Sequence, residues 1–466
     1  MPQLVPRPTL AARLGLFDAT MLVMGGIVGS GIFINPYVVA GLVHTPALIL
    51  GAWLAGGAIA LAGAFIYAEL ADRMPKVGGQ YAYIREAYHP LLGFLYGWIC
   101  LLVIHAGGSA AVAVTFAKYF SVFSHGAVPE KFIAVAVVLI FTVVNCLGVR
   151  AGGGVQSVFM LLRIVAIAMI VLCGVRLVFW PVGWPIGWPP ANAAHTAWLP
   201  VLDRPLSFDL LTVFGATMIP ALFAYGGFQT SNYLAGEIRE PRKNLSKALL
   251  LGVIGVIVLY VSANFIYVQA LSPAGLAATA TPASAVMSSA LGPLGGALIA
   301  IAIAISTLGF LSQAMLSYPR VAFAMAEDGV LPGVFARLGA RSRAPIAAIA
   351  LLGALISATV LLGTYEQILS YVVVMDWLFF GLSASCLFVF RARDARRRDG
   401  AAPESGYRVP GHPWTTGVFV AVAWLVVLNT IYKYPRNAGI ALCILFAGVP
   451  VYFLFRGRAG RPPGSK

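Results

Sequence analysis

The chain has 466 residues, of which 60% are hydrophobic and 10% charged, and its formal net charge is +15. Soluble domains carry about 25% charged residues, so this composition excludes a soluble globular protein. Long apolar segments recur along the whole length and leave no soluble domain of useful size between them. We therefore predict an all-α polytopic membrane protein with a single transmembrane domain over residues 1–466.

Apolar segments of about 20 residues, the length at which a helix crosses a bilayer, indicate twelve transmembrane spans. The first six are expected near 16–39, 47–70, 91–122, 131–149, 153–180 and 207–236. The second six are expected near 246–271, 293–324, 345–363, 366–391, 414–433 and 437–456. An even number of spans places both termini on the same side of the membrane.

The distribution of basic residues predicts which side that is, because cytoplasmic loops retain Lys and Arg. Of the 31 basic residues, 24 fall on the side shared with the termini. We expect a cell (inner) membrane protein whose N-terminus (1–15) and tail (457–466) are cytoplasmic, with no removable signal peptide. Membrane topology and anionic lipids account for the positive charge, so no nucleic-acid partner is expected.

The first span contains the run Gly25-Gly26-Ile27-Val28-Gly29-Ser30-Gly31 in its middle. A bilayer offers no water to unpaired amides, so irregular backbone at this depth is confined to protein interiors and wet cavities. The sixth span has a second interruption, Phe223-Ala224-Tyr225-Gly226-Gly227-Phe228-Gln229. Interruptions in corresponding halves are typical of a transporter binding site. Taken alone, Gly25 and Gly29 also fit a close helix contact.

The two interruptions together suit a zwitterion. A half-helix that begins near Ser30 and Gly31 presents unpaired amides and a positive dipole end to a carboxylate. Half-helices that end near Ile27 and near Phe223–Gly226 present carbonyl groups to an ammonium group. This favours an α-amino acid over a sugar or an inorganic ion. Spans one and six are equivalent if the first ten helices form two five-helix repeats, 16–180 and 207–391, followed by helices 11 and 12 over 414–456.

Four ordered motifs carry a family resemblance: "GGIVGSGIF" in the first span, "YAEL" followed by "PKVGGQYAYIREA", "FAYGGF" with "EIREPRKNLSKAL", and "PRVAFAMAEDGVLP" after the eighth span. Together they resemble the amino acid–polyamine–organocation (APC) superfamily. Within it, the chain is most similar to the L-type amino acid transporters and their bacterial relatives. The resemblance implies a LeuT-type fold: twelve transmembrane helices, a 5+5 inverted repeat, and discontinuous helices 1 and 6.

The resemblance also implies the roles of individual residues. The substrate carboxylate would meet amides of Gly29, Ser30 and Gly31. The ammonium group would meet carbonyls at Ile27, Phe223, Ala224 and Gly226, and the Phe223 ring would close over the substrate from outside. Gln229 stands where the family often has asparagine, so its contact with the substrate is less secure.

Arg163 stands in the fifth span where the family typically has lysine. An intramembrane cation is costly and is functional by default, although an arginine at the edge of a span can extend to the interface instead. We expect Arg163 inside the bundle, where its fixed charge substitutes for a sodium ion. Arginine does not deprotonate in proteins, so proton coupling would need another group. Asp376 in the tenth span is the candidate, unless it neutralises an interior cation or lies near a helix end.

Together these features predict a sodium-independent amino acid transporter, an exchanger of neutral L-amino acids by alternating access. The alternative is a proton-coupled amino acid permease or a cationic amino acid or polyamine permease. We expect no enzymatic activity, no metal and no cofactor, because no catalytic or ligand cluster occurs at a suitable spacing. No heavy-chain subunit is expected, because segment 121–131 lacks the cysteine that would link one. The cytoplasmic charges near Glu69 and Arg73 fit either a solvated loop or ion pairs of an inward gate.

Overall fold

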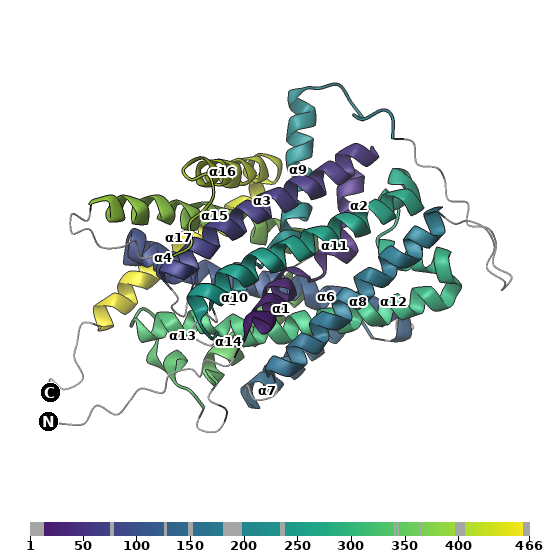
Figure 1. Cartoon of the computed structure of the whole chain (residues 1–466). Helices are drawn as coiled ribbons and strands as arrows, with labels where there is room; N and C mark the ends of the chain where they lie inside the picture. The colour runs from purple at the N-terminus through teal and green to yellow at the C-terminus, as the bar shows by residue number, and fades with distance from the viewer. Residues whose placement is uncertain are drawn as a thin grey trace, which may run out of the picture.

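The computed structural model describes residues 14–74, 79–124, 128–147, 152–179, 198–233, 238–339, 342, 344–363, 365–396 and 406–459. Over these residues the secondary structure is helical, apart from one isolated bridge between Leu14 and Ile238 (Figure 1). The predicted all-α class is confirmed.

Among the described residues, the first half of the chain contributes nine helical elements. In order they are α1 (Leu16–Ile27), α2 (Gly31–Leu42), α3 (Pro46–Arg73), α4 (Gln80–Ala87), α5 (Pro90–Ile99), the π-helix η1 (Cys100–His105), α6 (Ala106–Ser124), α7 (Glu130–Leu147) and α8 (Gly152–Phe179).

The described part of the second half contributes ten more. They are α9 (Phe208–Tyr225), α10 (Thr230–Tyr233), α11 (Pro241–Ala277), α12 (Pro282–Ser317), α13 (Pro319–Glu327), the 3-10 helix η4 (Gly333–Ala336), α14 (Ile346–Leu362), α15 (Tyr365–Arg396), α16 (Trp414–Lys433) and α17 (Pro435–Ala459). Ser272 and Gly292 have positive φ angles of 61° and 66° and precede prolines, so they divide α11 and α12.

Eleven helical segments of the described residues are long and apolar enough to cross a membrane, which makes the protein a multi-pass membrane protein. The predicted span at 345–363 forms α14, an apolar helix of 17 residues. The count of twelve and the inverted repeat remain predictions, as do the domain boundaries.

Both predicted interruptions are confirmed as breaks in the helices. In the first span, α1 ends at Ile27, Val28 leaves the helical region with ψ of 88°, and α2 begins at Gly31. In the sixth span, α9 ends at Tyr225 and a turn of four residues leads to α10. Buried backbone of this kind places unpaired amides and carbonyls in the middle of the bundle.

Two glycines hold these breaks against each other. A Cβ atom on Gly31 would lie 2.7 Å from the Cα atom of Ala224, so α2 approaches α9 at backbone distance. Gly227 has φ of 93°, and a Cβ atom there would collide with the carbonyl oxygen of Gly26. The glycines therefore serve close packing as well as the break.

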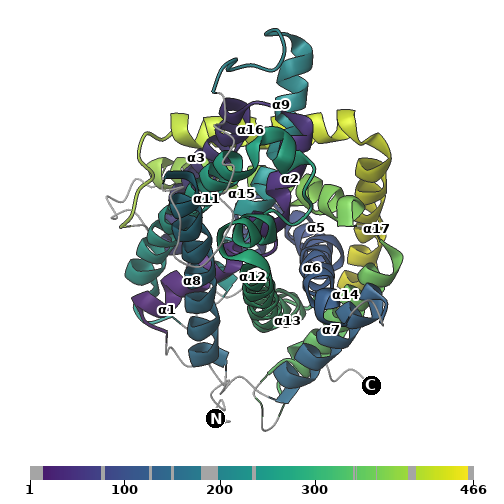
Figure 2. The same ribbon diagram turned by 90° about the vertical axis from the view of Figure 1, so that its right-hand side faces the viewer.

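The helices that surround the breaks come from both halves of the chain. Helix α11 packs on α3 and α1, while α12 packs on α8 and α6. Figure 2 shows α16 and α17 at the edge of the bundle and α12 near its middle. The site is therefore enclosed by elements far apart in sequence.

Candidate functional site

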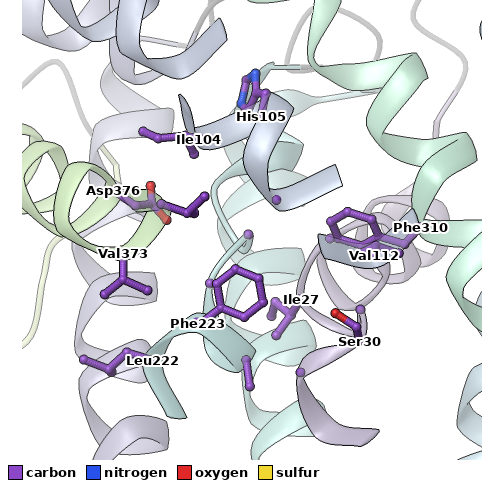
Figure 3. A pocket seen from close by; sticks show the side chains of 18 of the residues that line it. Ile27, Ser30, Ile104, His105, Val112, Leu222, Phe223, Phe310, Val373 and Asp376 are labelled. Atoms are coloured by element: carbon purple, nitrogen blue, oxygen red, sulfur yellow. The ribbon is translucent and has the colours of Figure 1, made fainter. Parts of the chain in front are cut away.

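A cavity of about 640 Å³, counted with the solvent at its mouth, lies between the two breaks (Figure 3). Its wall includes every residue predicted to bind substrate, together with groups from α6, α12 and α15: Ile27, Gly29, Ser30, Gly31, Phe223, Ala224, Gly226, Gln229, Val112, Phe310 and Asp376.

The amide end of the cavity is formed by the start of α2. Ser30 is the N-cap residue, and its carbonyl accepts the amides of Phe33 and Ile34. The first amides of a helix have no intrahelical acceptor, which leaves them for an anion. The hydroxyl of Ser30 is buried and has no hydrogen-bond partner among the described residues. A buried donor of this kind suits a substrate carboxylate.

The carbonyl end is formed by the last turns of α1 and α9. The carbonyl oxygen of Phe223 accepts one hydrogen bond, from the amide of Gly226 at 3.2 Å. The carbonyl oxygen of Ile27 already accepts two, from the amide of Gly29 at 2.8 Å and from the hydroxyl of Tyr260 at 3.2 Å. Two donors occupy both lone pairs of a carbonyl. In this conformation Phe223 is therefore better placed than Ile27 to bind an ammonium group.

Phe223 and Gln229 also contribute side chains to the cavity. Figure 3 shows the Phe223 ring near Ile27. In this view the ring lies between Ser30 and Asp376. The side-chain oxygen of Gln229 is buried without a hydrogen-bond partner among the described residues, so it is free to accept from a ligand. The role of Phe223 as a gate remains a prediction.

Arg163 lies inside the bundle, as the sequence predicts, and its side chain is fully buried. It does not line the cavity but lies behind the break. Its Nη1 atom donates to the carbonyl of Gly25 at 2.8 Å, and its Nε atom donates to the carbonyl of Ser306 at 3.0 Å. Among the described residues no carboxylate pairs with it. Its charge is therefore balanced by backbone carbonyls of α1 and α12.

Two further side chains bind the end of α1 in the same way. Gln313 of α12 donates to the carbonyl of Leu22 at 2.8 Å, and Tyr260 of α11 donates to Ile27. The Ile27 carbonyl lies in the last turn of the helix, where carbonyls lack intrahelical donors and donor side chains stabilise them, whereas the Leu22 carbonyl lies more than one turn earlier. The broken end of α1 is thus held by α8, α11 and α12 together.

Asp376 of α15 lines the cavity, which the sequence alone did not establish. Its Oδ2 atom lies 3.7 Å from the position that a Cβ atom on Gly226 would take. Asp376 forms no ion pair with a described cation. The possibility that it neutralises an interior cation such as Arg163 is therefore not supported.

His105 also lines the cavity, at the end of the π-helix η1. Its ring stacks on Tyr318 with 3.6 Å between centroids, and its Nε2 atom lies 3.1 Å from the sulfur of Cys100. The stacking makes His105 a packed residue of the cavity wall. No pattern in the sequence indicates the π-helix. Its wider turn shifts the helical register of the third span, and π-helical turns frequently occur at functional sites.

The charges near the end of α3 form a buried cluster, so a solvated loop is the wrong interpretation for Glu69 and Arg73. The Glu69 carboxylate accepts from Arg73 at 2.9 Å, from Arg391 at 2.6 Å and from the amide of Val409 at 2.7 Å. Arg73 also pairs with Asp394 at 2.7 Å. These contacts join α3 to α15 and to the segment before α16.

The relatives found by comparison with known proteins agree with one another. Over residues 14–454 the chain matches the family described as "Amino acid permease". It is 30% identical to the "Serine/threonine exchanger SteT" of Bacillus subtilis (strain 168), covering 96% of this chain and 98% of that protein. It is 30% identical to the human "Large neutral amino acids transporter small subunit 2", covering 96% of this chain and 80% of that protein.

The human "Asc-type amino acid transporter 1" is 28% identical, with 97% of this chain and 84% of that protein covered. All three relatives are named as transporters or exchangers of amino acids and not as enzymes. The family match spans nearly the whole chain and includes both breaks. The chain therefore belongs to the amino acid permease family of the APC superfamily.

Proposed function

We propose that the protein exchanges amino acids across the membrane by alternating access and without sodium. A zwitterion fits between the amides at the start of α2 and the carbonyls at the end of α9. The relatives, named as exchangers and transporters of amino acids, support the same substrate class.

The geometry of Arg163 carries the proposal of sodium independence. A metal cation beside a broken helix would be bound by backbone carbonyls. The guanidinium of Arg163 instead bridges the carbonyls of Gly25 and Ser306, on α1 and α12, at 2.8 and 3.0 Å. A permanent charge at this position provides the electrostatic stabilisation that a sodium ion would provide, without a concentration dependence.

Neutral L-amino acids are the proposed substrates. The side chains of Ile104, Val112, Val372 and Phe310 give much of the cavity wall an apolar surface, which suits an uncharged substrate side chain. The relatives are named for serine and threonine and for large neutral amino acids, so they do not decide the size of that side chain.

A second candidate is a proton-coupled or cationic amino acid permease, and Asp376 is the observation that favours it. Its carboxylate lines the cavity and could take a proton or a positive side chain. We place this candidate second because Asp376 is the only carboxylate among the described residues that line the cavity.

We also propose that the protein acts without a heavy-chain subunit, in the cell membrane, with both termini cytoplasmic. Segment 121–131 offers no cysteine for a disulfide to a partner. One relative carries "small subunit" in its name, while another is named simply as an exchanger.

A counterflow assay tests the proposal. Purified protein in liposomes is loaded with one unlabelled amino acid from a panel, and uptake of the labelled amino acid is measured. We expect uptake to require an internal neutral amino acid. If size-exclusion chromatography shows that the protein is folded and no amino acid of the panel is taken up, the proposal is overturned.

A further inference from the structure

We infer that Asp376 is the anionic ligand of the substrate's α-ammonium group. The inference rests on the proposed function and adds to it a carboxylate on α15, outside both broken helices. It assigns the cation-binding half of the zwitterion site to a side chain as well as to backbone carbonyls.

The first argument is geometric. Three oxygen atoms surround the empty space beside Gly226: the carbonyls of Phe223 and Leu222 and the Oδ2 atom of Asp376 lie 3.3, 3.5 and 3.7 Å from the position of an added Cβ. Because residue 226 is glycine, no side chain fills this space, and all four residues line the cavity. An ammonium group entering from the cavity would meet a carboxylate and carbonyls together.

The second argument is electrostatic. Asp376 is partly buried and has no ion pair among the described residues, and a charge partly removed from water is less stable than a paired one. Arg163 does not supply that pair: its Nη1 and Nε atoms bind the carbonyls of Gly25 and Ser306 behind the break. A cationic group from the substrate would complete the Asp376 site.

The third argument separates the α-ammonium from a cationic side chain. The Ile27 carbonyl is occupied by two donors, so the ammonium group needs other acceptors close to the break. Asp376 lies beside the Phe223 carbonyl at the end of α9, where the α-ammonium is expected. Near Val112 and Phe310, the described residues of the cavity wall include no carboxylate for a cationic side chain.

The test compares wild type with Asp376→Asn, which keeps the shape and removes the charge. Binding is measured by competition against the labelled amino acid that the wild type exchanges best. The competitors are that amino acid, its 2-hydroxy acid, which lacks the ammonium group, and lysine. We expect the preference for the amino acid over its 2-hydroxy acid to fall at least about tenfold in Asp376→Asn, and the preference for lysine over a neutral amino acid to stay constant.

Two variants control for structural damage. Asp376→Glu keeps the charge and should keep the preference within about threefold of wild type. Asp209→Asn removes an exposed carboxylate from the first turn of α9, and its binding should equal that of wild type. Preference is a ratio, so it is unaffected by a change in the amount of active protein.

Three results would overturn the inference. An unchanged preference for the ammonium group would exclude Asp376 as its ligand. A loss confined to lysine would assign Asp376 to a substrate side chain. If the exchange rate of Asp376→Asn, measured over a range of pH, lost the pH dependence of wild type while amino acid binding stayed unchanged, Asp376 would be a proton carrier. In each case the wild type still transports amino acids, whereas failure of the proposed function shows as absence of wild-type transport.

Discussion

Two buried arginines in different regions of this bundle have opposite partners. Arg163, behind the break in the first span, binds two backbone carbonyls and no described carboxylate. Arg73, at the C-terminal end of α3, binds Glu69 and Asp394. A paired arginine acts as a structural link between helices, whereas for the arginine on carbonyls at the helix break we propose the place of a cation. The group that a buried arginine binds therefore indicates its function better than its burial does.

Removal of Glu69 should give the largest effect. In Glu69→Gln the guanidinium groups of Arg73 and Arg391 lose their shared carboxylate, and breaking a buried ion pair costs about 3–5 kcal/mol. We expect a clearly lower midpoint of thermal unfolding in detergent. Glu240→Gln is the control, because its pair with Lys243 is exposed and contributes about 0–1 kcal/mol. Equal midpoints for wild type and Glu69→Gln would show that the cluster does not hold α3 to α15.

Substitution of Arg163 should affect transport more than substrate binding. Each hydrogen bond from a charged group contributes about 1.5–3 kcal/mol, so Arg163→Ala is expected to slow exchange by about a hundredfold with a smaller change in KM. Arg163→Lys keeps the charge but not the planar fork of donors, so its rate should be intermediate. Initial exchange rates in liposomes measure both. A rate for Arg163→Ala within twofold of wild type would contradict this role.

Removal of the Ser30 hydroxyl should raise KM for the amino acid by about fivefold, corresponding to about 1 kcal/mol for one hydrogen bond. Ser357→Ala is the matched control, since that hydroxyl binds the carbonyl of Gly353 within α14. Gly31→Val is expected to abolish substrate binding, but the valine side chain would also force α2 away from Ala224. Ser30→Ala therefore tests the anion site more cleanly. An unchanged KM in Ser30→Ala would count against a carboxylate contact there.

The smallest effect is expected outside the membrane, at Asp203. Burial raises the pKa of Asp203, but hydrogen bonds from Arg204 and from the His44 amide outweigh it and hold the pKa below its usual range. The stabilisation from ionised Asp203 is therefore present at neutral pH and lost as the pH falls through the lowered pKa. Asp203→Asn should lower the unfolding midpoint slightly at pH 7, and this difference should disappear in acid. A difference that grows in acid would contradict the assignment.

The helix breaks and the interior position of Arg163 were predictable from the sequence. Both rest on local features, since paired glycines inside an apolar span and a cation ten residues into another stand out without any tertiary information. The side-chain contacts were not predictable, because Ser306 lies 143 residues from Arg163 and comes from another helix. The place of Asp376 beside Gly226 likewise depends on how α15 packs against α9. The burial of Glu69 needed Arg391 and Val409, both more than 300 residues away.

The sodium dependence of exchange tests the central claim most directly. Wild-type protein in liposomes is assayed for amino acid exchange with sodium present and with sodium replaced by choline on both sides of the membrane. The position of Arg163 on the carbonyls of Gly25 and Ser306 predicts equal rates and equal KM in the two buffers. Exchange that requires sodium would contradict the claim that Arg163 occupies the place of a cation.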